Sequence, residues 1–253
     1  MNLLLPENIF SSLLEKNLPE DLKTCVKYLP SSLITKELKN DDSAAALIPV
    51  TDLLNNKELF VSGKAGLSFE DSLCNSYIYF GPGKKDLGRI GLAGDVSSVE
   101  AVLSKILFKE LYNSDIEISL VSGQDNFDDQ NLLLVGGKNY EGEKFNSGIS
   151  FAEEIIEIIS LPFVNFVFAS KSKNIIEELN SKIAGIGKRI YESIEENDFG
   201  INLSGSAKDY IRANISSAVF EFNEQDIDGI DQLLRLPYYH GIIKDIVVVN
   251  FVK

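Results

Sequence analysis

Segments typical of strands alternate with segments typical of helices along this chain, and this alternation constrains the fold more than any other feature. It predicts an α/β protein with largely parallel sheets. The expected strands are Ala44–Ile48, Ser76–Phe80, Arg89–Leu92, Asn131–Val135 and Val164–Ala169. The expected helices, in which apolar residues recur every three or four positions, are Asp52–Asn56, Ser98–Tyr112, Ser150–Ser160, Lys173–Glu195, Asp209–Phe222 and Glu224–Leu236. The last segment, Asp245–Val252, fits either a closing strand or an apolar tail.

Two connections are candidate hinges between lobes. Gly81–Lys85 follows an expected strand, and Leu161–Val164 interrupts an apolar run. A chain that leaves a first lobe at one connection and returns at the other forms two α/β lobes with a ligand cleft between them. This predicts lobe one from residues 1–84 and 165–253 and lobe two from residues 85–164. A single open sheet with long excursions is the alternative.

Charge and composition exclude several classes of partner. The net charge of −14 argues against nucleic acid and anionic lipid, which need a broad positive surface, but it leaves room for a small anion held by N–H groups in a cleft. No apolar stretch is long enough to cross a bilayer, and the segment Met1–Glu7 lacks the features of a secretory signal, so we expect a cytoplasmic protein. Cys25 and Cys74 have no paired spacing, and we expect buried thiols, no metal site and no cofactor.

The stretch Gly91–Glu100 is a turn that opens a helix with two hydroxyls, Ser97 and Ser98, in its first turn. The first N–H groups of a helix lack internal partners and carry the positive end of the helix dipole, so such an end can bind a carboxylate or phosphate. The alternative is that Asp95 or Ser97 only caps the helix.

With these segments in order, the chain resembles the chorismate dehydratases of the futalosine route of menaquinone biosynthesis, which share the type II periplasmic-binding-protein fold. The resemblance covers most of the chain from about Ala44 onward. Its motifs correspond to Ala46–Pro49, Asp95–Ala101, Leu132–Gly137, Leu161–Ala169 and Gly229–Leu233.

The resemblance implies a two-lobed fold with two crossover hinges, in which a cofactor-free enzyme eliminates water from chorismate in the cleft. It places Asn8 in a catalytic position. Substrate-binding positions in lobe two would be Ser97, Ser98, Val99 and Gly137, and in lobe one Ser31, Ser32 and Thr51. The partner would be a small anionic carboxylate, and a homodimer stays open.

This chain departs from the family pattern in the cleft. Asp95 stands where the family has a serine, and Gly137 where it has an aspartate. A carboxylate at position 95 opposes an anionic substrate unless it turns away. No general base is evident, since the single histidine, His240, fits a structural role beside tyrosines near a helix end.

Whether the protein is an enzyme therefore stays open. The alternatives to a dehydratase are a non-catalytic solute-binding protein or degenerate paralogue of the same fold, and an interaction subunit whose cleft is filled by its own side chains. An inward Asp95, in a cleft lined by hydroxyls and amides, would favour a binder.

Overall fold

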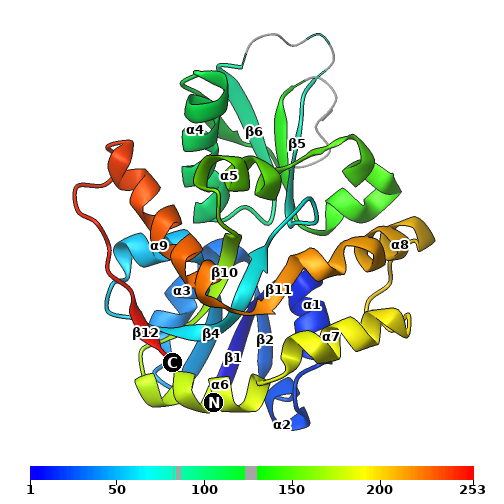
Figure 1. The fold of residues 1–253 in the computed structure, drawn as a ribbon, viewed down its shortest axis with the longest axis vertical. Helices are drawn as coiled ribbons and strands as arrows, with labels where there is room; N and C mark the ends of the chain where they lie inside the picture. The colour runs from blue at the N-terminus through cyan, green and yellow to red at the C-terminus, as the bar shows by residue number, and fades with distance from the viewer. Residues whose placement is uncertain (82, 84–86, 123–129) are drawn as a thin grey trace.

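The computed structural model describes residues 1–81, 83, 87–122 and 130–253, and its elements form two α/β lobes (Figure 1). The candidate hinge Gly81–Lys85 lies partly outside these residues. The elements of lobe one are β1 (Asn2–Pro6), α1 (Ile9–Lys16), α2 (Glu20–Lys23), β2 (Val26–Leu29), α3 (Ser31–Asn40), β3 (Ala44–Pro49), η1 (Val50–Asn55), β4 (Phe60–Phe69), β10 (Phe163–Ser170), α6 (Lys173–Ile183), α7 (Ile186–Glu195), α8 (Gly205–Asn214), η4 (Ile215–Ser217), β11 (Ala218–Glu221), α9 (Glu224–Tyr239) and β12 (Asn250–Val252). Those of lobe two are β5 (Ser76–Tyr79), β6 (Arg89–Gly94), α4 (Ser98–Tyr112), β7 (Glu117–Leu120), β8 (Leu132–Val135), η3 (Gly137–Ser147), β9 (Ile149–Ser150) and α5 (Phe151–Ile159).

Lobe one is built on the larger sheet, which in the described part of the chain has seven strands. Their order is β11-β4-β10-β3-β1-β2, with β12 also paired to β4. The strands β1, β2 and β3 run parallel, whereas β10 is antiparallel to both β3 and β4. The apolar run of β3 is buried throughout, as expected for a central strand with both faces covered. The helix α3 packs on β1 and β3, and α9 packs on β10.

Lobe two is built on the smaller sheet, whose five strands among the described residues follow the order β7-β6-β8-β5-β9. The strand β6 is parallel to β7 and β8, and β5 is antiparallel to β8. Gly94 ends β6 at φ +91°, where a Cβ atom would lie 1.9 Å from the Val135 carbonyl oxygen. Only glycine fits that close approach.

The chain crosses between the sheets after β4 and again between α5 and β10. The first crossover therefore precedes β5, so the predicted assignment of Ser76–Tyr79 to lobe one is wrong. The pattern placed the boundary at the glycines and proline after β5, but backbone pairing with β8 makes this strand part of lobe two. The β10 strand begins at Phe163, close to the predicted return.

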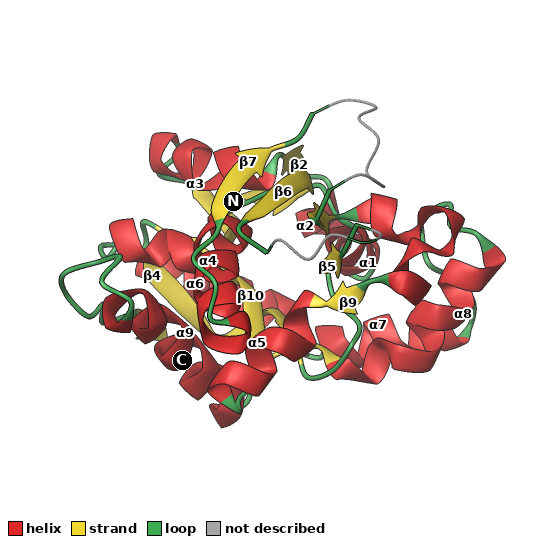
Figure 2. Ribbon diagram, turned by 90° about the horizontal axis from the view of Figure 1, so that it is seen from above, coloured by secondary structure: helices red, strands yellow, loops and turns green. Residues whose placement is uncertain are grey.

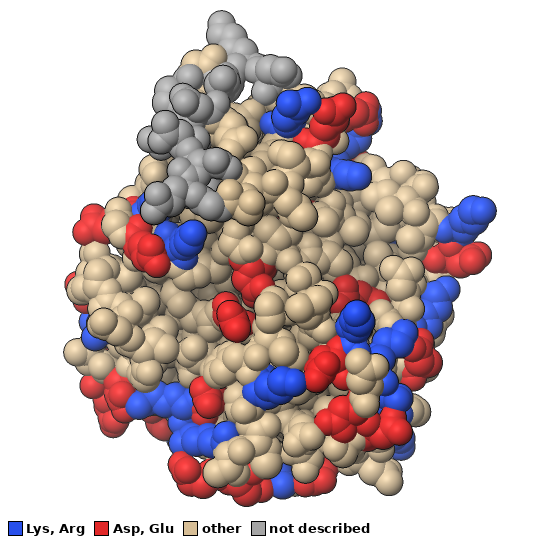
Figure 3. Space-filling view, turned by 180° about the vertical axis from the view of Figure 1, so that it is seen from behind, with Lys and Arg blue, Asp and Glu red and all other residues tan. Residues whose placement is uncertain are grey.

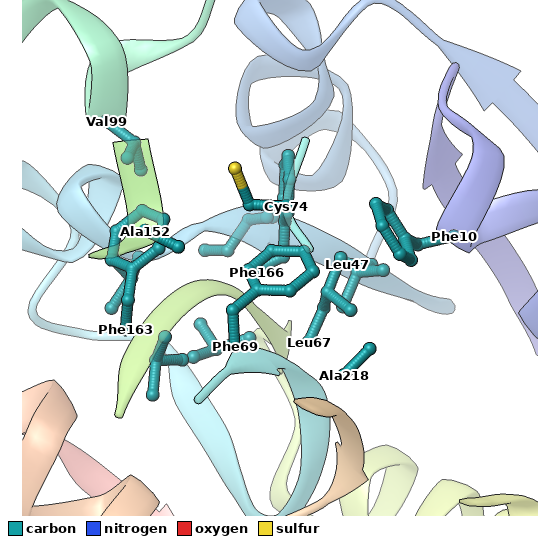
Figure 4. Close-up of a cluster of buried hydrophobic side chains, with 14 of the residues drawn as sticks. Phe10, Leu47, Leu67, Phe69, Cys74, Val99, Ala152, Phe163, Phe166 and Ala218 are labelled. Carbon is teal, nitrogen blue, oxygen red and sulfur yellow. The ribbon is translucent and has the colours of Figure 1, made fainter. Parts of the chain in front are cut away.

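One buried apolar cluster runs through both lobes at these crossovers (Figure 4). Phe69 ends β4, and its ring stacks on that of Phe163 at the start of β10 with centroids 6.3 Å apart. Phe151 of α5 meets Phe163 edge-on at 5.8 Å. Aromatic packing on both crossover strands joins the lobes through a shared core.

Four predicted elements differ in the structure. The expected helix Asp209–Phe222 ends at Asn214 with α8, and the residues after it form η4 and the strand β11, because β11 pairs with β4. The expected helix Lys173–Glu195 is two helices, α6 and α7, because Gly185 adopts φ +74° between them. The expected helix Asp52–Asn56 is the 3₁₀ helix η1. The strand of the last segment is confined to β12, which pairs in parallel with β4. No helix in the described ranges has both the length and the hydropathy needed to cross a membrane.

Candidate ligand-binding cleft

The residues that follow β1 in lobe one and β8 in lobe two lie in the wall of one cavity. Figure 2 shows the helices and strands of the molecule from above. The strand β1 ends at Pro6, and Asn8 then caps α1 by accepting a hydrogen bond from the Ser11 N–H at 2.8 Å. In lobe two, β8 ends at Val135 and is followed by Gly137. The carboxyl ends of parallel strands are the usual place for ligands in α/β proteins. Asn8 is only 6% exposed, and its Nδ2 finds no acceptor in the part of the chain that the structure describes.

These strand ends border a cavity of about 740 Å³. Both lobes contribute to its wall, which consists of Glu7, Asn8, Ile9, Ser12, Tyr28, Gly137, Tyr140, Glu141, Gly142 and Ile201–Ser204. Ligand pockets usually measure about 300–1,000 Å³, so this cavity can hold a small molecule. Asn8 and Gly137 are the sequence-predicted site residues that the structure brings into this wall.

Beside the cavity, Asp95 of lobe two reaches the N-terminus of α3 in lobe one. The backbone N–H of Ser31 donates to Asp95 Oδ1 at 2.8 Å, and the Ser31 hydroxyl donates to Oδ2 at 2.5 Å. The local cap position of α3 is Pro30, which makes no side-chain cap hydrogen bond, so Asp95 takes that role from the other lobe. Burial raises the pKa of the Asp95 carboxyl, the bonds from Ser31 lower it, and the charge of Glu7 raises it further.

A second contact between the lobes joins the N-terminus of α4 to η1. The Ser98 hydroxyl donates to Asp52 Oδ1 at 2.5 Å and lies 2.6 Å from the Thr51 hydroxyl. The other oxygen of Asp52 accepts a hydrogen bond from the Thr35 hydroxyl. Asp52 thus occupies the hydroxyl of Ser98, and Asp95 occupies the donors of Ser31. The resemblance implied that a carboxylate of the substrate would bind to these serines. Their substrate-binding roles stay predictions.

The other predicted residues of the two helix starts lie outside the cavity wall. Ser97 forms a capping box with Glu100: the Ser97 hydroxyl accepts from the Val99 N–H at 3.1 Å, and the Ser97 N–H donates to Glu100 Oε2 at 2.9 Å. Burial raises the pKa of Glu100, and the bonds from Ser97 lower it. Val99 is fully buried in the core, whereas Ser32 is exposed on α3. The capping alternative therefore describes the observed geometry of Ser97.

Comparison with known proteins gives matches in structure but not in sequence. No family model and no curated protein matches the chain. A crystal structure of a protein from Archaeoglobus fulgidus aligns with a TM-score of 0.67 and 11% identity, covering 95% of this chain and 98% of that one. The periplasmic aliphatic sulphonate binding protein of Escherichia coli aligns with a TM-score of 0.61 and 9% identity over 98% and 89% of the two chains. The alkanesulfonate-binding protein of Xanthomonas axonopodis pv. citri, bound to MOPS, gives 0.56 and 12% over 100% and 97%.

The chain has a type II periplasmic-binding-protein-like fold. This confirms the fold that the resemblance implied. Periplasmic binding proteins close their two lobes around a ligand by hinge and shear motion. The cavity between the lobes is therefore the place to look for a ligand in this fold. At these identities the comparisons establish the fold alone.

Several wall residues of this periplasmic-binding-protein-like cleft were missed by the sequence reasoning. Glu7 adjoins Asn8 and could have been found with it, but Tyr28 sits on an edge strand outside the expected elements. Tyr140 and Glu141 lie in η3, whose irregular turn has no helical or strand periodicity. The segment Ile201–Ser204 carries no motif that points to a ligand.

His240 lies outside the cavity wall and joins the two lobes. It follows α9 of lobe one, and its Nε2 is 2.9 Å from Glu110 Oε1 on α4 of lobe two. The described residues contain no cluster of His, Cys, Asp and Glu suited to a metal ion.

Proposed function

We propose that this protein binds a small molecule in the cavity between its lobes. The observation that carries the proposal is the cavity of about 740 Å³, with Asn8 and Gly137 in its wall from opposite lobes. The fold supports it too, because two of the similar structures are named as sulphonate-binding proteins.

Elimination of water from chorismate is the second candidate, and one observation favours it. Asn8, the residue to which the resemblance gave a catalytic position, lies in the cavity wall. Against it stands the geometry of the helix ends: Asp95 occupies the donors of Ser31, and Asp52 accepts the Ser98 hydroxyl. Chorismate has two carboxylates that need such donors, so ligand binding is the better supported function.

A cavity-blocking variant tests the binding proposal. A Cβ atom on Gly137 would meet nothing within 4 Å, so Gly137→Leu places its side chain in open space without backbone strain. Gly205 is equally free of neighbours but does not line the cavity, which makes Gly205→Leu the matched control. A metabolite library is screened by thermal shift, and hits are measured by calorimetry. We expect binding to wild type and to Gly205→Leu that is lost in Gly137→Leu. Binding that survives in Gly137→Leu, or a screen without hits, would count against the proposal.

Chorismate is tested separately, by incubation with the protein and chromatography of the products. Because Asn8 also caps α1, Asn8→Ser keeps a capping oxygen while removing the amide. An enolpyruvyl benzoate product that wild type forms and Asn8→Ser does not would establish the dehydratase. No turnover by wild type removes it and leaves the binding proposal standing.

A further inference from the structure

The wall of the cavity is acidic. Glu7 enters it from lobe one and Glu141 from lobe two, and among the described lining residues none is Lys, Arg or His. Glu15 adds a carboxylate behind the wall, where its Oε2 accepts a hydrogen bond from the Tyr28 hydroxyl at 2.7 Å. Acidic atoms also lie in a hollow near the centre of the face shown in Figure 3.

We infer that the ligand of this cavity is a small organic cation, a protonated amine that also carries a hydrogen-bonding oxygen. The inference rests on the proposed function and names its ligand class. It differs from the carboxylate that the resemblance implied, because a carboxylate placed between Glu7 and Glu141 would meet like charge from both lobes.

Two helix N-termini at the cavity carry partial positive charge, but this charge is too small to make the cavity wall positive. Asn8 caps α1 and Ser204 caps α8, and both line the cavity. A helix N-terminus carries about half a positive charge, so both together offset roughly one of the two glutamates. The cap oxygens also accept hydrogen bonds from the N–H groups of Ser11 and Ala207, which leaves fewer donors for an anion.

The nearby lysine of α1 does not change this balance. Lys16 lies on the same helix that Asn8 caps, but its ammonium group is 2.6 Å from Asp198 Oδ2. Glu7 is also close enough to Asp95 for its charge to raise the pKa of that carboxyl.

The cavity wall also contains aromatic residues and the amide of Asn8, which suit a ligand that has both an amine and a polar oxygen. Tyr28 and Tyr140 are among the lining residues, and aromatic side chains are typical of sites for organic ammonium groups. Asn8 lines the cavity, and its buried Nδ2 group has no acceptor in the described residues. An unpaired buried donor is costly, so a ligand oxygen that reaches this amide would remove that cost. This unpaired amide is a second observation, independent of the charges, that points to a ligand.

Pairs of probes that share a carbon skeleton and differ in charge test the inference. One pair is tyramine and 4-hydroxyphenylacetate, and the other is 4-aminobutan-1-ol and 4-hydroxybutanoate, with butane-1,4-diol as the neutral reference. Calorimetry is run on wild type, Glu7→Gln, Glu141→Gln and the control Glu143→Gln, which removes an exposed carboxylate from the same loop without touching the wall. We expect the amines to bind, and to bind about tenfold more weakly to each of the two wall variants but not to the control.

The results separate this inference from the proposed function. Preferential binding of the carboxylates or the diol, lost in Gly137→Leu, overturns the inference and leaves the cavity as a binding site. Amine binding that is unchanged in both Glu7→Gln and Glu141→Gln also overturns it. Failure of every probe overturns the inference, whereas the proposed function is decided by the library screen and its Gly137→Leu control.

Discussion

Replacement of Asp95 by alanine removes the carboxylate that joins the lobes at α3. Ser31 is fully buried and donates both its N–H and its hydroxyl to this carboxylate. Since Pro30 supplies no side-chain cap, Asp95→Ala also leaves the N-terminus of α3 without a side-chain acceptor. In Asp95→Asn both contacts can persist, because Oδ1 still accepts from the N–H and the new amide can donate to the Ser31 hydroxyl.

The expected loss follows from these two bonds and from the cost of burying the charge. A hydrogen bond to a charged group contributes about 1.5–3 kcal/mol, and losing a helix cap costs about 1 kcal/mol. Burial works against the ionised carboxyl of Asp95, as its raised pKa shows, and offsets part of the gain. We therefore expect Asp95→Ala to lower the free energy of unfolding at pH 7 by about 2 kcal/mol, and Asp95→Asn to be at least as stable as wild type.

Urea unfolding followed by circular dichroism measures these differences. Asp228→Ala removes an exposed carboxylate from α9 and is the control for the change in net charge. A loss below about 0.5 kcal/mol in Asp95→Ala, or an equal loss in Asp95→Ala and Asp95→Asn, would refute the reasoning. The first result would mean that the contact contributes nothing net, and the second that the amide cannot replace the carboxylate.

Three further predictions concern pH, capping and backbone space. The pKa of Asp95 is raised in the folded protein, so the folded state holds this proton more tightly than the unfolded state. Wild type should therefore lose stability relative to Asp95→Asn as the pH rises from about 3.9, the unfolded pKa, through the folded pKa. Urea unfolding from pH 3.5 to 7 measures the direction of this change. Ser97→Ala should cost about 1 kcal/mol through loss of the capping box, whereas Ser206→Ala, beyond the cap of α8, should cost less than about 0.5 kcal/mol by the same assay. Gly94→Ala should cost more than about 3 kcal/mol because its Cβ would overlap a carbonyl oxygen of β8, and Gly205→Ala, with open space at its Cβ, should be tolerated when thermal unfolding is compared.

The sequence pattern predicted the buried strands β3, β8 and β10, but it missed the short buried strand β1 and the interrupted strand β4. The strands β3 and β8 are continuous apolar runs, and β10 is apolar apart from Asn165 and its final Ser170, so a local pattern can detect all three. The strand β4 was missed because Ser62, Gly63, Lys64 and Gly66 interrupt its apolar residues. Its identity as a strand depends on pairing with β10, β11 and β12, which come much later in the chain.

The site was less predictable because its contacts join segments far apart in the sequence. The spacing around Ser97 and Ser98 correctly indicated a helix start, but it could not show which lobe-one groups would face it. Ser31 and Asp95 are 64 residues apart, and Thr51 and Ser98 are 47 apart. Which hydroxyl meets which carboxylate depends on how the two sheets are placed, and the periodicity of a single helix or strand carries no such information.

Glu7 connects the cavity to the contact between the lobes. It lines the cavity, and its charge raises the pKa of Asp95, so a cation bound beside Glu7 would screen that charge and favour the ionised form of Asp95. The ionised carboxylate is the stronger acceptor for the buried Ser31 donors. A bound cation would then strengthen the contact between Asp95 and Ser31, and that contact would strengthen binding of the cation by the same amount. In Glu7→Gln the pKa of Asp95 should be lower, and the pH dependence that distinguishes wild type from Asp95→Asn should shift toward acid; an unchanged pH profile would show that the cavity and the Asp95 contact act independently.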